Sequence, residues 1–279
     1  MEQVPDYLVI GHVCKDLTPA GPRLGGTVTF SALTAQALGL RAAVLTSTSA
    51  DMQELLLPLR TVSLVNVPAE HPTTFENIYV PEGRHQRLLG RGAPLLPSHV
   101  PSAWRSAPIV HLAPVADEVD PSLAEFFSSS SFIGVTPQGW MRHWNKEGRV
   151  SFRPWQEADR VLSYANAVVL SIEDVDGDQG LVRGYAGKAQ VLVMTLGAQG
   201  SLLFVQGKEY AVPAPQVIEQ DPTGAGDIFA TAFFVRLSAT GDPFEAARFA
   251  TLLASASVEY LGLDSIPSAD TIQAALFQP

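Results

Sequence analysis

The chain has 279 residues, of which 28 are acidic and 18 basic, so that its formal net charge is −10. An apolar fraction of 46% with 16% charged residues excludes a disordered chain, and the acidic balance argues against nucleic acid as the main partner, since a phosphate backbone needs a basic face. A single cysteine, Cys14, excludes an internal disulfide.

The N-terminal segment has no pattern typical of a targeting signal. Met1 to Asp6 contains two acidic side chains and no basic one, and the apolar run that follows is too short for a secretory signal. The uncharged stretch from Ala189 to Gly207 predicts two short strands around the turn Gly197 to Gly200 rather than a membrane span. We therefore expect a cytoplasmic protein without a transmembrane helix.

Along the chain, strand patterns alternate with helical ones. Tyr7 to Gly11 is a short apolar run typical of a strand buried on both faces, and after a proline-rich turn Thr27 to Leu40 has apolar positions at helical spacing. Further strands are predicted at Arg41 to Thr46, Val62 to Val67, Ile109 to Leu112, Phe132 to Val135, Ala167 to Leu170 and Val191 to Thr195. This alternation predicts an α/β fold with a mainly parallel sheet and helices on both faces.

One segment departs from the alternation. Thr73 to Val80, the turn Pro81-Glu82-Gly83 and Gln86 to Leu89 predict an antiparallel hairpin that could form a flap over a site. Its arginines either meet phosphates as bidentate donors or lie on a solvated face, and they are Arg84, Arg87 and Arg91.

From Gly224 onward the sequence is helical. Helices are predicted over Gly224 to Ala239, Phe244 to Leu261 and Ser268 to Phe277. No linker marks a domain boundary, which favours one domain spanning residues 1–279.

The common phosphate, metal and hydrolase signatures are absent from the sequence. There is no Gly-x4-Gly-Lys-Ser/Thr, no Gly-x-Gly-x-x-Gly, no His-Glu-x-x-His and no Gly-x-Ser-x-Gly. P-loop, simple Rossmann, zincin and α/β-hydrolase assignments therefore lose support.

The motif Asp221-Pro-Thr-Gly-Ala-Gly-Asp227 stands directly before an apolar helix. Small residues at 224–226 allow backbone N–H groups to point outward at the helix N-terminus, where orphan donors and the helix dipole favour an anion such as a transferring phosphoryl group. A substrate hydroxyl lying there could pass its proton to Asp227. The alternative is a glycine-rich helix start in which Asp227 only complements the dipole.

This motif resembles the C-terminal Asp-Thr-x-Gly-Ala-Gly-Asp signature of the ribokinase or PfkB family of carbohydrate kinases. Three other segments are similar to family motifs in the same order: Val9-Ile-Gly-His-Val-Cys-Lys-Asp16 to a first strand ending on a substrate-binding aspartate, Gly25-Gly26 to the double glycine, and Met194-Thr-Leu-Gly-Ala-Gln-Gly200 to the nucleotide loop. The resemblance implies a three-layer α/β/α, Rossmann-like fold with a small β-hairpin lid.

Carried over by position, the resemblance assigns most of the candidate site. It implies that Asp227 is the catalytic base and that Gly224, Ala225 and Gly226 form the anion hole. Substrate hydroxyls would be bound by Asp16, which otherwise is a turn aspartate, beside Gly25 and Gly26, which otherwise only turn the chain into the helix. The nucleotide would lie against Thr195, Gly197 and Gly200, for which a plain hairpin turn is the alternative.

Other positions depart from the family pattern. Phe30 stands where many members carry a sugar-binding asparagine, and Ser171-Ile-Glu-Asp174 stands in place of Asn-x-x-Glu near the magnesium and phosphates. Asp174 is thus the candidate for a water-mediated Mg²⁺ contact and Glu173 the fallback, with Ser171 on the nucleotide side; a solvated acidic turn is the alternative.

The remaining candidates concern a cation, the lid and the pocket wall. Asp221 and Thr223 fall where relatives hold a monovalent cation, and Thr223 is also a nucleotide-side candidate. The first lid element is expected to be short, so that a reduced lid is formed by about 17–24 and 73–91. Arg142 is a substrate-binding candidate, since the loop from Thr136 to Arg142 follows a strand and fits a pocket wall; Trp140 as plain core and Arg142 as a surface ion are the alternatives.

Together these features predict an ATP- and Mg²⁺-dependent kinase that phosphorylates a hydroxyl of a sugar, polyol or nucleoside. Its partners would be that small molecule and no nucleic acid or membrane, and the protein would be a monomer or a homodimer. A catalytically silent relative acting as a sensor, and a nucleotide-using enzyme of similar architecture with different chemistry, are the alternatives.

Overall fold

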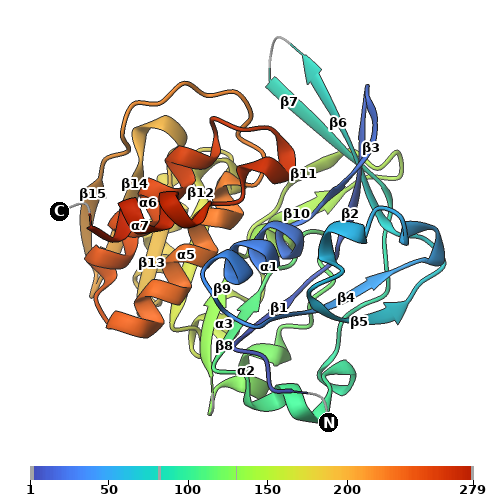
Figure 1. The fold of residues 1–279 in the computed structure, drawn as a ribbon, viewed down its shortest axis with the longest axis horizontal. Helices are drawn as coiled ribbons and strands as arrows, with labels where there is room; N and C mark the ends of the chain where they lie inside the picture. Colours follow the sequence, from blue (N-terminus) through green and yellow to red (C-terminus); the bar gives the residue numbers. More distant parts are fainter. Residues whose placement is uncertain (1–2, 81–82, 130, 278–279) are drawn as a thin grey trace.

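A large sheet forms the centre of the computed structural model, which describes residues 3–80, 83–129 and 131–277 (Figure 1). Its strand order is β15-β14-β13-β12-β9-β8-β1-β4-β5. The strands from β13 to β5 pair in parallel, and β14 and β15 are antiparallel additions at one edge. Their bounds are β1 Tyr7–Ile10, β4 Ala42–Thr48, β5 Ser63–Pro68, β8 Ile109–Leu112, β9 Phe132–Val135, β12 Ala167–Ser171, β13 Val191–Thr195, β14 Ser201–Val205 and β15 Lys208–Val212.

Alternate side chains of the central strands enter cores on opposite faces of this sheet. In β1, Leu8 and Ile10 join a cluster that contains residues of α2, α3 and α4, whereas Tyr7 and Val9 pack on the side of α1. The helices are α1 Thr27–Ala37, α2 Ser122–Phe127, α3 Ala158–Leu162, α4 Gln179–Ala186, α5 Ala225–Thr240, α6 Pro243–Ser257 and α7 Ala269–Phe277. This confirms the predicted three-layer α/β/α arrangement.

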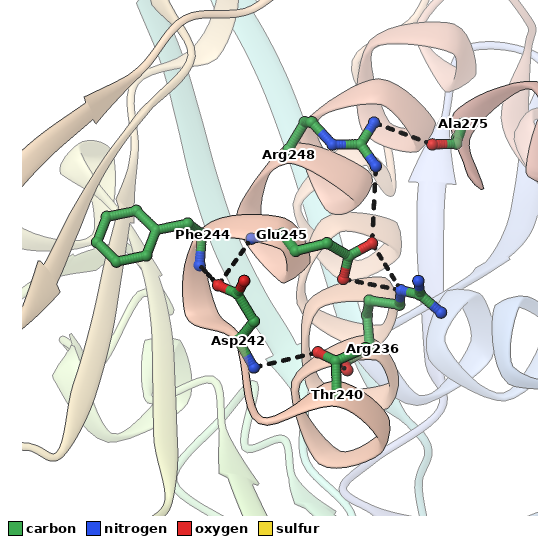
Figure 2. Close-up of polar contacts among 7 residues, drawn as sticks. All are labelled: Arg236, Thr240, Asp242, Phe244, Glu245, Arg248 and Ala275. Carbon is green, nitrogen blue, oxygen red and sulfur yellow. Dashed lines mark hydrogen bonds and ion pairs between the residues drawn. The ribbon is translucent and has the colours of Figure 1, made fainter. Parts of the chain in front are cut away.

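The helices α5, α6 and α7 are tied together at the end of α5 farthest from its N-terminus (Figure 2). Glu245 accepts two hydrogen bonds of 2.8 Å from Arg236 Nε, and Arg248 donates to the Ala275 carbonyl at 3.0 Å. The helix α6 ends at Ser257, earlier than predicted, because the Val258 carbonyl accepts the N–H groups of Gln220 and Asp221.

A second, smaller sheet forms the lid, and it contains two strands that the sequence did not predict. It has the order β3-β2-β6-β7, and its strands project from the large sheet at the upper right of Figure 1. The bounds are β2 Cys14–Thr18, β3 Gly21–Gly25, β6 Thr73–Val80 and β7 Gly83–Gly90. The hairpin β6–β7 was predicted, with residues 81–82 of its turn outside the described residues. The segment after the first strand was predicted as a turn and instead forms two strands.

The position of Asp16 also differs from the prediction. The first strand ends at Ile10, so Asp16 does not close it but lies within β2, opposite Arg23 of β3 and Phe75 of β6. The short ribbon β10 Arg142–Trp144 and β11 Val150–Phe152 was also not predicted. Within the described ranges, the structure has no helix of the length and apolarity that crossing a bilayer requires.

Candidate functional site

The start of α5 meets the start of α1 at the base of the second sheet. Gly224 precedes α5 in the left-handed conformation with φ of +83°. A β-carbon placed there would lie 2.2 Å from Cδ1 of Phe30 in α1, so a side chain at Gly224 would collide with that ring. Gly224, Ala225 and Gly226, which carry a single methyl group between them, therefore bring the helix N-terminus to the surface beside Asp227. The Ala225 N–H donates to the Pro222 carbonyl at 3.2 Å.

Asp227 is surrounded by other charged groups. Burial raises its pKa to about 7, although the residue keeps some exposed surface. Hydrogen bonding with Thr27 and the charge of Arg142 lower this pKa, whereas the carboxylates of Asp174 and Asp16 raise it. The structure thus brings together Asp16, Arg142, Asp174 and Asp227, which the sequence singled out, and adds Thr27, which it did not.

The double glycine is required by the close approach of β2. A β-carbon on Gly25 would lie 1.9 Å from Oδ2 of Asp16, and one on Gly26, whose φ is +89°, would lie 2.5 Å from the His12 carbonyl oxygen. The Asp16 carboxylate therefore packs directly against bare backbone at the start of α1. Both glycines therefore permit the close packing of β2 against the start of α1.

A cavity of about 330 Å³ opens beside these residues. Its lining includes Asp16, Phe30 and Thr223, together with Asn77 of β6, which the sequence analysis missed. Asn77 Oδ1 accepts a hydrogen bond of 3.0 Å from Gln86 Nε2. A second cavity, of about 400 Å³, shares the lining residues Arg23, Leu24 and Gly262 with the first, but Asp16 does not line it.

The acidic turn after β12 distinguishes Asp174 from Glu173. Asp174 Oδ2 accepts the Ser171 N–H at 2.8 Å and its Oδ1 accepts from Gln138 Nε2 at 2.8 Å. Glu173 is exposed to solvent. Of the two carboxylates, Asp174 is the one whose charge raises the pKa of Asp227. In the part of the chain that is described, no three His, Cys, Asp or Glu side chains are grouped to hold a metal by themselves.

The nucleotide-loop candidates lie at the same edge of the sheet as this turn. Thr195 at the end of β13 is the register partner of Ser171 at the end of β12. Gly197 and Gly200 both have positive φ, of 58° and 90°. A β-carbon on Gly200 would lie 2.1 Å from the Val212 carbonyl oxygen, so this turn also needs glycine to pass close to backbone.

Arg142 connects this site with the second sheet. Its Nη1 donates to the Val115 carbonyl at 2.9 Å, and its Cζ lies 5.3 Å from the centre of the Phe75 ring in β6. Arg142 is therefore not a free surface ion. Trp140, in contrast, is core: it is 3% exposed and stacks on Trp155.

The arginines of the flap have structural partners. Arg87 pairs with Glu76 at 3.2 Å, and Arg91 donates to the Ala116 carbonyl at 2.8 Å. The side chain of Arg84 lies outside the described residues. For Arg87 and Arg91 these contacts favour the alternative of a supporting surface over phosphate binding.

A buried polar cluster at the base of the second sheet escaped the sequence analysis. His12, fully buried, contacts Thr73 Oγ1 through Nδ1 at 2.6 Å and the Ala93 carbonyl through Nε2 at 2.8 Å. Glu118, 1% exposed, accepts N–H groups of His12, Val115 and Ala116. The cluster fixes β6 to the loop after β1. The sequence indicated this cluster only through His12, which lies in the motif from Val9 to Asp16.

Comparisons with known proteins agree with this geometry. Residues 169–270, which include the acidic turn, the nucleotide loop and Asp227, match the pfkB family carbohydrate kinase model. A fructokinase of Klebsiella pneumoniae is 29% identical over 58% of this chain and 54% of its own length. A ribokinase of Arabidopsis thaliana is 44% identical over 29% of this chain and 21% of its own length. The matches thus span about half or less of these curated relatives.

Solved structures match over nearly the whole chain. A pyrophosphate-dependent kinase in the ribokinase family, complexed with a pyrophosphate analogue and myo-inositol, has a TM-score of 0.80 at 23% identity and covers 92% of this chain and 96% of its own. Ribokinase of Arabidopsis thaliana with ribose and ATP has a TM-score of 0.75 at 17% identity over 99% and 100%. Residues 169–270 thus match the model of the pfkB family of carbohydrate kinases, and the chain as a whole has the fold of ribokinase.

Proposed function

We propose that this protein is a kinase that transfers the γ-phosphoryl group of ATP to a hydroxyl group of a sugar, polyol or nucleoside. The single observation that carries the proposal is the placement of Asp227 in the first turn of α5, beside a helix N-terminus of small residues and close to Asp16 and Asp174. One catalytic domain would carry the whole site, with the sheet β3-β2-β6-β7 as its lid.

The reaction follows from the chemistry of these groups. The acceptor hydroxyl donates its proton to Asp227, and its oxygen forms the new bond to the γ-phosphorus. The bond from that phosphorus to the bridging oxygen breaks, and ADP leaves with the electron pair. The N–H groups of Gly224 and Gly226 would stabilise the charge on the transferring phosphoryl oxygens, whereas the Ala225 N–H donates to the Pro222 carbonyl at 3.2 Å. Arg142 adds a positive charge on the lid side.

Acceptor binding is assigned to the cavity of about 330 Å³. The Asp16 carboxylate accepts two hydrogen bonds from neighbouring hydroxyls, and Asn77 can both donate and accept. Phe30 supplies an apolar wall where a polar contact would otherwise be. Gly25 and Gly26 keep that wall close to β2.

The donor side is assigned to the carboxyl ends of β12 and β13. Thr195, Gly197 and Gly200 would line the nucleotide, with Ser171 and Thr223 nearer its phosphates. A Mg²⁺ ion bound with the nucleotide would neutralise phosphate charge. Asp174, held by Ser171 and Gln138, fits a water-mediated contact with this ion.

A panel of donors and acceptors tests the proposal. ATP and pyrophosphate, each with Mg²⁺, should be offered with ribose, fructose, myo-inositol and nucleosides, and the phosphorylated product measured. We expect acceptor-dependent consumption of ATP. Product from pyrophosphate alone would overturn the donor assignment, a different product the reaction class, and binding without turnover would favour a silent sensor.

A further inference from the structure

The position predicted to hold a monovalent cation is filled by the protein's own donors. Asp221 Oδ1 accepts the Thr223 N–H at 3.0 Å, and its Oδ2 accepts the Gly262 N–H at 3.1 Å. Although burial works in the opposite direction, these hydrogen bonds hold the pKa of Asp221 below its ordinary value. Both oxygens of the carboxylate are therefore directed at N–H groups, which present positive charge to the space that a cation would need.

A backbone oxygen that contacts this loop is also occupied. The Val258 carbonyl accepts the N–H of Gln220 at 2.8 Å and that of Asp221 at 3.1 Å. Hard cations require several oxygen ligands that can converge on one point. The Val258 carbonyl has both lone pairs in use, and each Asp221 oxygen has one lone pair left, so these residues by themselves do not supply the several converging oxygen ligands that a monovalent cation needs.

A fixed positive charge stands nearby. Arg23 in β3 lines both cavities together with Gly262, and its charge contributes to the lowered pKa of Asp221. Across the residues that the structure describes, Arg23 has no hydrogen bond or ion pair of its own with another side chain. Arg23 belongs to the lid sheet, where it is the register partner of Asp16.

We propose that the loop beneath the anion hole is held by the Thr223 and Gly262 N–H groups and by Arg23 of the lid, in place of a bound monovalent cation. The consequence is a kinase whose rate is independent of K⁺ and Na⁺. The loop that carries Gly224 is ordered by Asp221 three residues earlier, so an internal clamp here supports the anion hole directly. This inference rests on the proposed function. It adds a role for the lid, whose Arg23 would supply the positive charge beside Asp221.

Two measurements on the purified protein test the proposal independently. The rate of phosphoryl transfer should agree within about two-fold in KCl, NaCl and tetramethylammonium chloride at equal ionic strength. The melting temperature should also be the same in the three salts, because an ion that binds only the folded state raises it. A rate or a melting temperature that rises specifically with K⁺ or Na⁺ would overturn the proposal. Absence of turnover in every salt would instead contradict the proposed function, and the melting temperatures would still decide the cation question.

The variant Arg23→Gln tests the role of the lid arginine, with Arg87→Gln as the matched control on the same sheet. We expect Arg23→Gln to lower kcat about ten-fold in tetramethylammonium chloride. Addition of K⁺ should partly restore the kcat of this variant, because a bound cation can replace the lost positive charge of Arg23. Arg87→Gln should match the parent protein in all salts. A rise in KM without any rescue by K⁺ would assign Arg23 to acceptor binding and overturn this part, as would wild-type kinetics of Arg23→Gln.

Discussion

Asp227 combines two properties that a general base needs near neutral pH. Its carboxyl group lies within the protein and close to Asp174 and Asp16, and burial with these like charges raises its pKa to about 7. A base is most effective when its pKa lies near the working pH, because it is then largely ionised and still a good proton acceptor. The surroundings of Asp227 thus favour proton abstraction over a purely dipolar role.

The raised pKa predicts the acid limb of the rate profile. Below pH 7 the protonated fraction of Asp227 increases, so kcat/KM should fall by about ten-fold for each pH unit. Initial rates from pH 5 to pH 9 at saturating donor measure this limb. A rate that stays constant from pH 8 down to pH 5 would contradict the assignment.

The same shift predicts how Asp227 affects stability. Its folded-state pKa of about 7 exceeds the ordinary value of 3.8, so the folded state binds more protons between these limits and loses stability as the pH rises through them. Asp227→Asn should therefore raise the free energy of unfolding at pH 8 by about 1–3 kcal/mol, and by less at pH 5. Urea unfolding at both pH values measures this. Equal stabilities of the two proteins at pH 8 would mean that the carboxylate carries no burial penalty.

At the scale of elements, the junction of α1 and α5 determines the shape of the anion hole. Gly224 has φ of +83° and faces the Phe30 ring, which is 3% exposed. Any β-carbon at this position is strained by the backbone and collides with the ring. The helix N-terminus can be presented in this way only while residue 224 is glycine.

Gly224→Ala should therefore reduce both stability and activity. We expect a loss of about 2–4 kcal/mol in the free energy of unfolding and a lowered kcat, because α5 or Phe30 must shift. Gly184→Ala in α4 is the control, since nothing lies within 4 Å of its added carbon. That variant should be as stable as the parent or more stable. A Gly224→Ala protein with wild-type stability and kcat would contradict this account.

The opposite end of α5 should affect stability without affecting chemistry. Glu245 lies between Arg236 and Arg248, and Arg248 in turn binds the last turn of α7 (Figure 2). Glu245→Ala leaves two partly buried guanidinium groups without their carboxylate and should cost about 1–3 kcal/mol in the free energy of unfolding. Thermal unfolding and kcat measured together test this. A loss of kcat in a protein of unchanged stability would show that this end of α5 communicates with the site.

At the scale of the whole molecule, the large sheet and the hairpin β6–β7 were predictable, whereas the strands β2 and β3 of the lid were not. Strands β1, β8 and β9 are short, largely apolar runs that are buried on both faces, so their pattern is strong. The strands β2 and β3 contain charged residues and Pro22, and β2 pairs in parallel with β6, nearly sixty residues away. Such a pairing depends on tertiary contacts that no local pattern records.

The candidate site also contains residues that the sequence predicted and residues that it did not. Asp227 and its glycines belong to one contiguous motif at a helix start, where sequence alone defines the local geometry. Thr27, Asn77 and His12 reach the site or its base through folding of separate segments, and each is a common residue without a local signature. The sequence already favoured Asp174 over Glu173, but the cap that Asp174 forms with Ser171 was visible only in the structure.

The most direct test compares the phosphorylated acceptor formed by the parent protein and by Asp227→Asn, with nucleotide binding measured in parallel. Asparagine keeps the shape of the side chain but cannot take up the proton. We expect acceptor-dependent product from the parent protein, a fall in kcat of about 10²–10⁴-fold for the variant, and unchanged or tighter nucleotide binding. Turnover by Asp227→Asn at the rate of the parent protein would contradict the central claim.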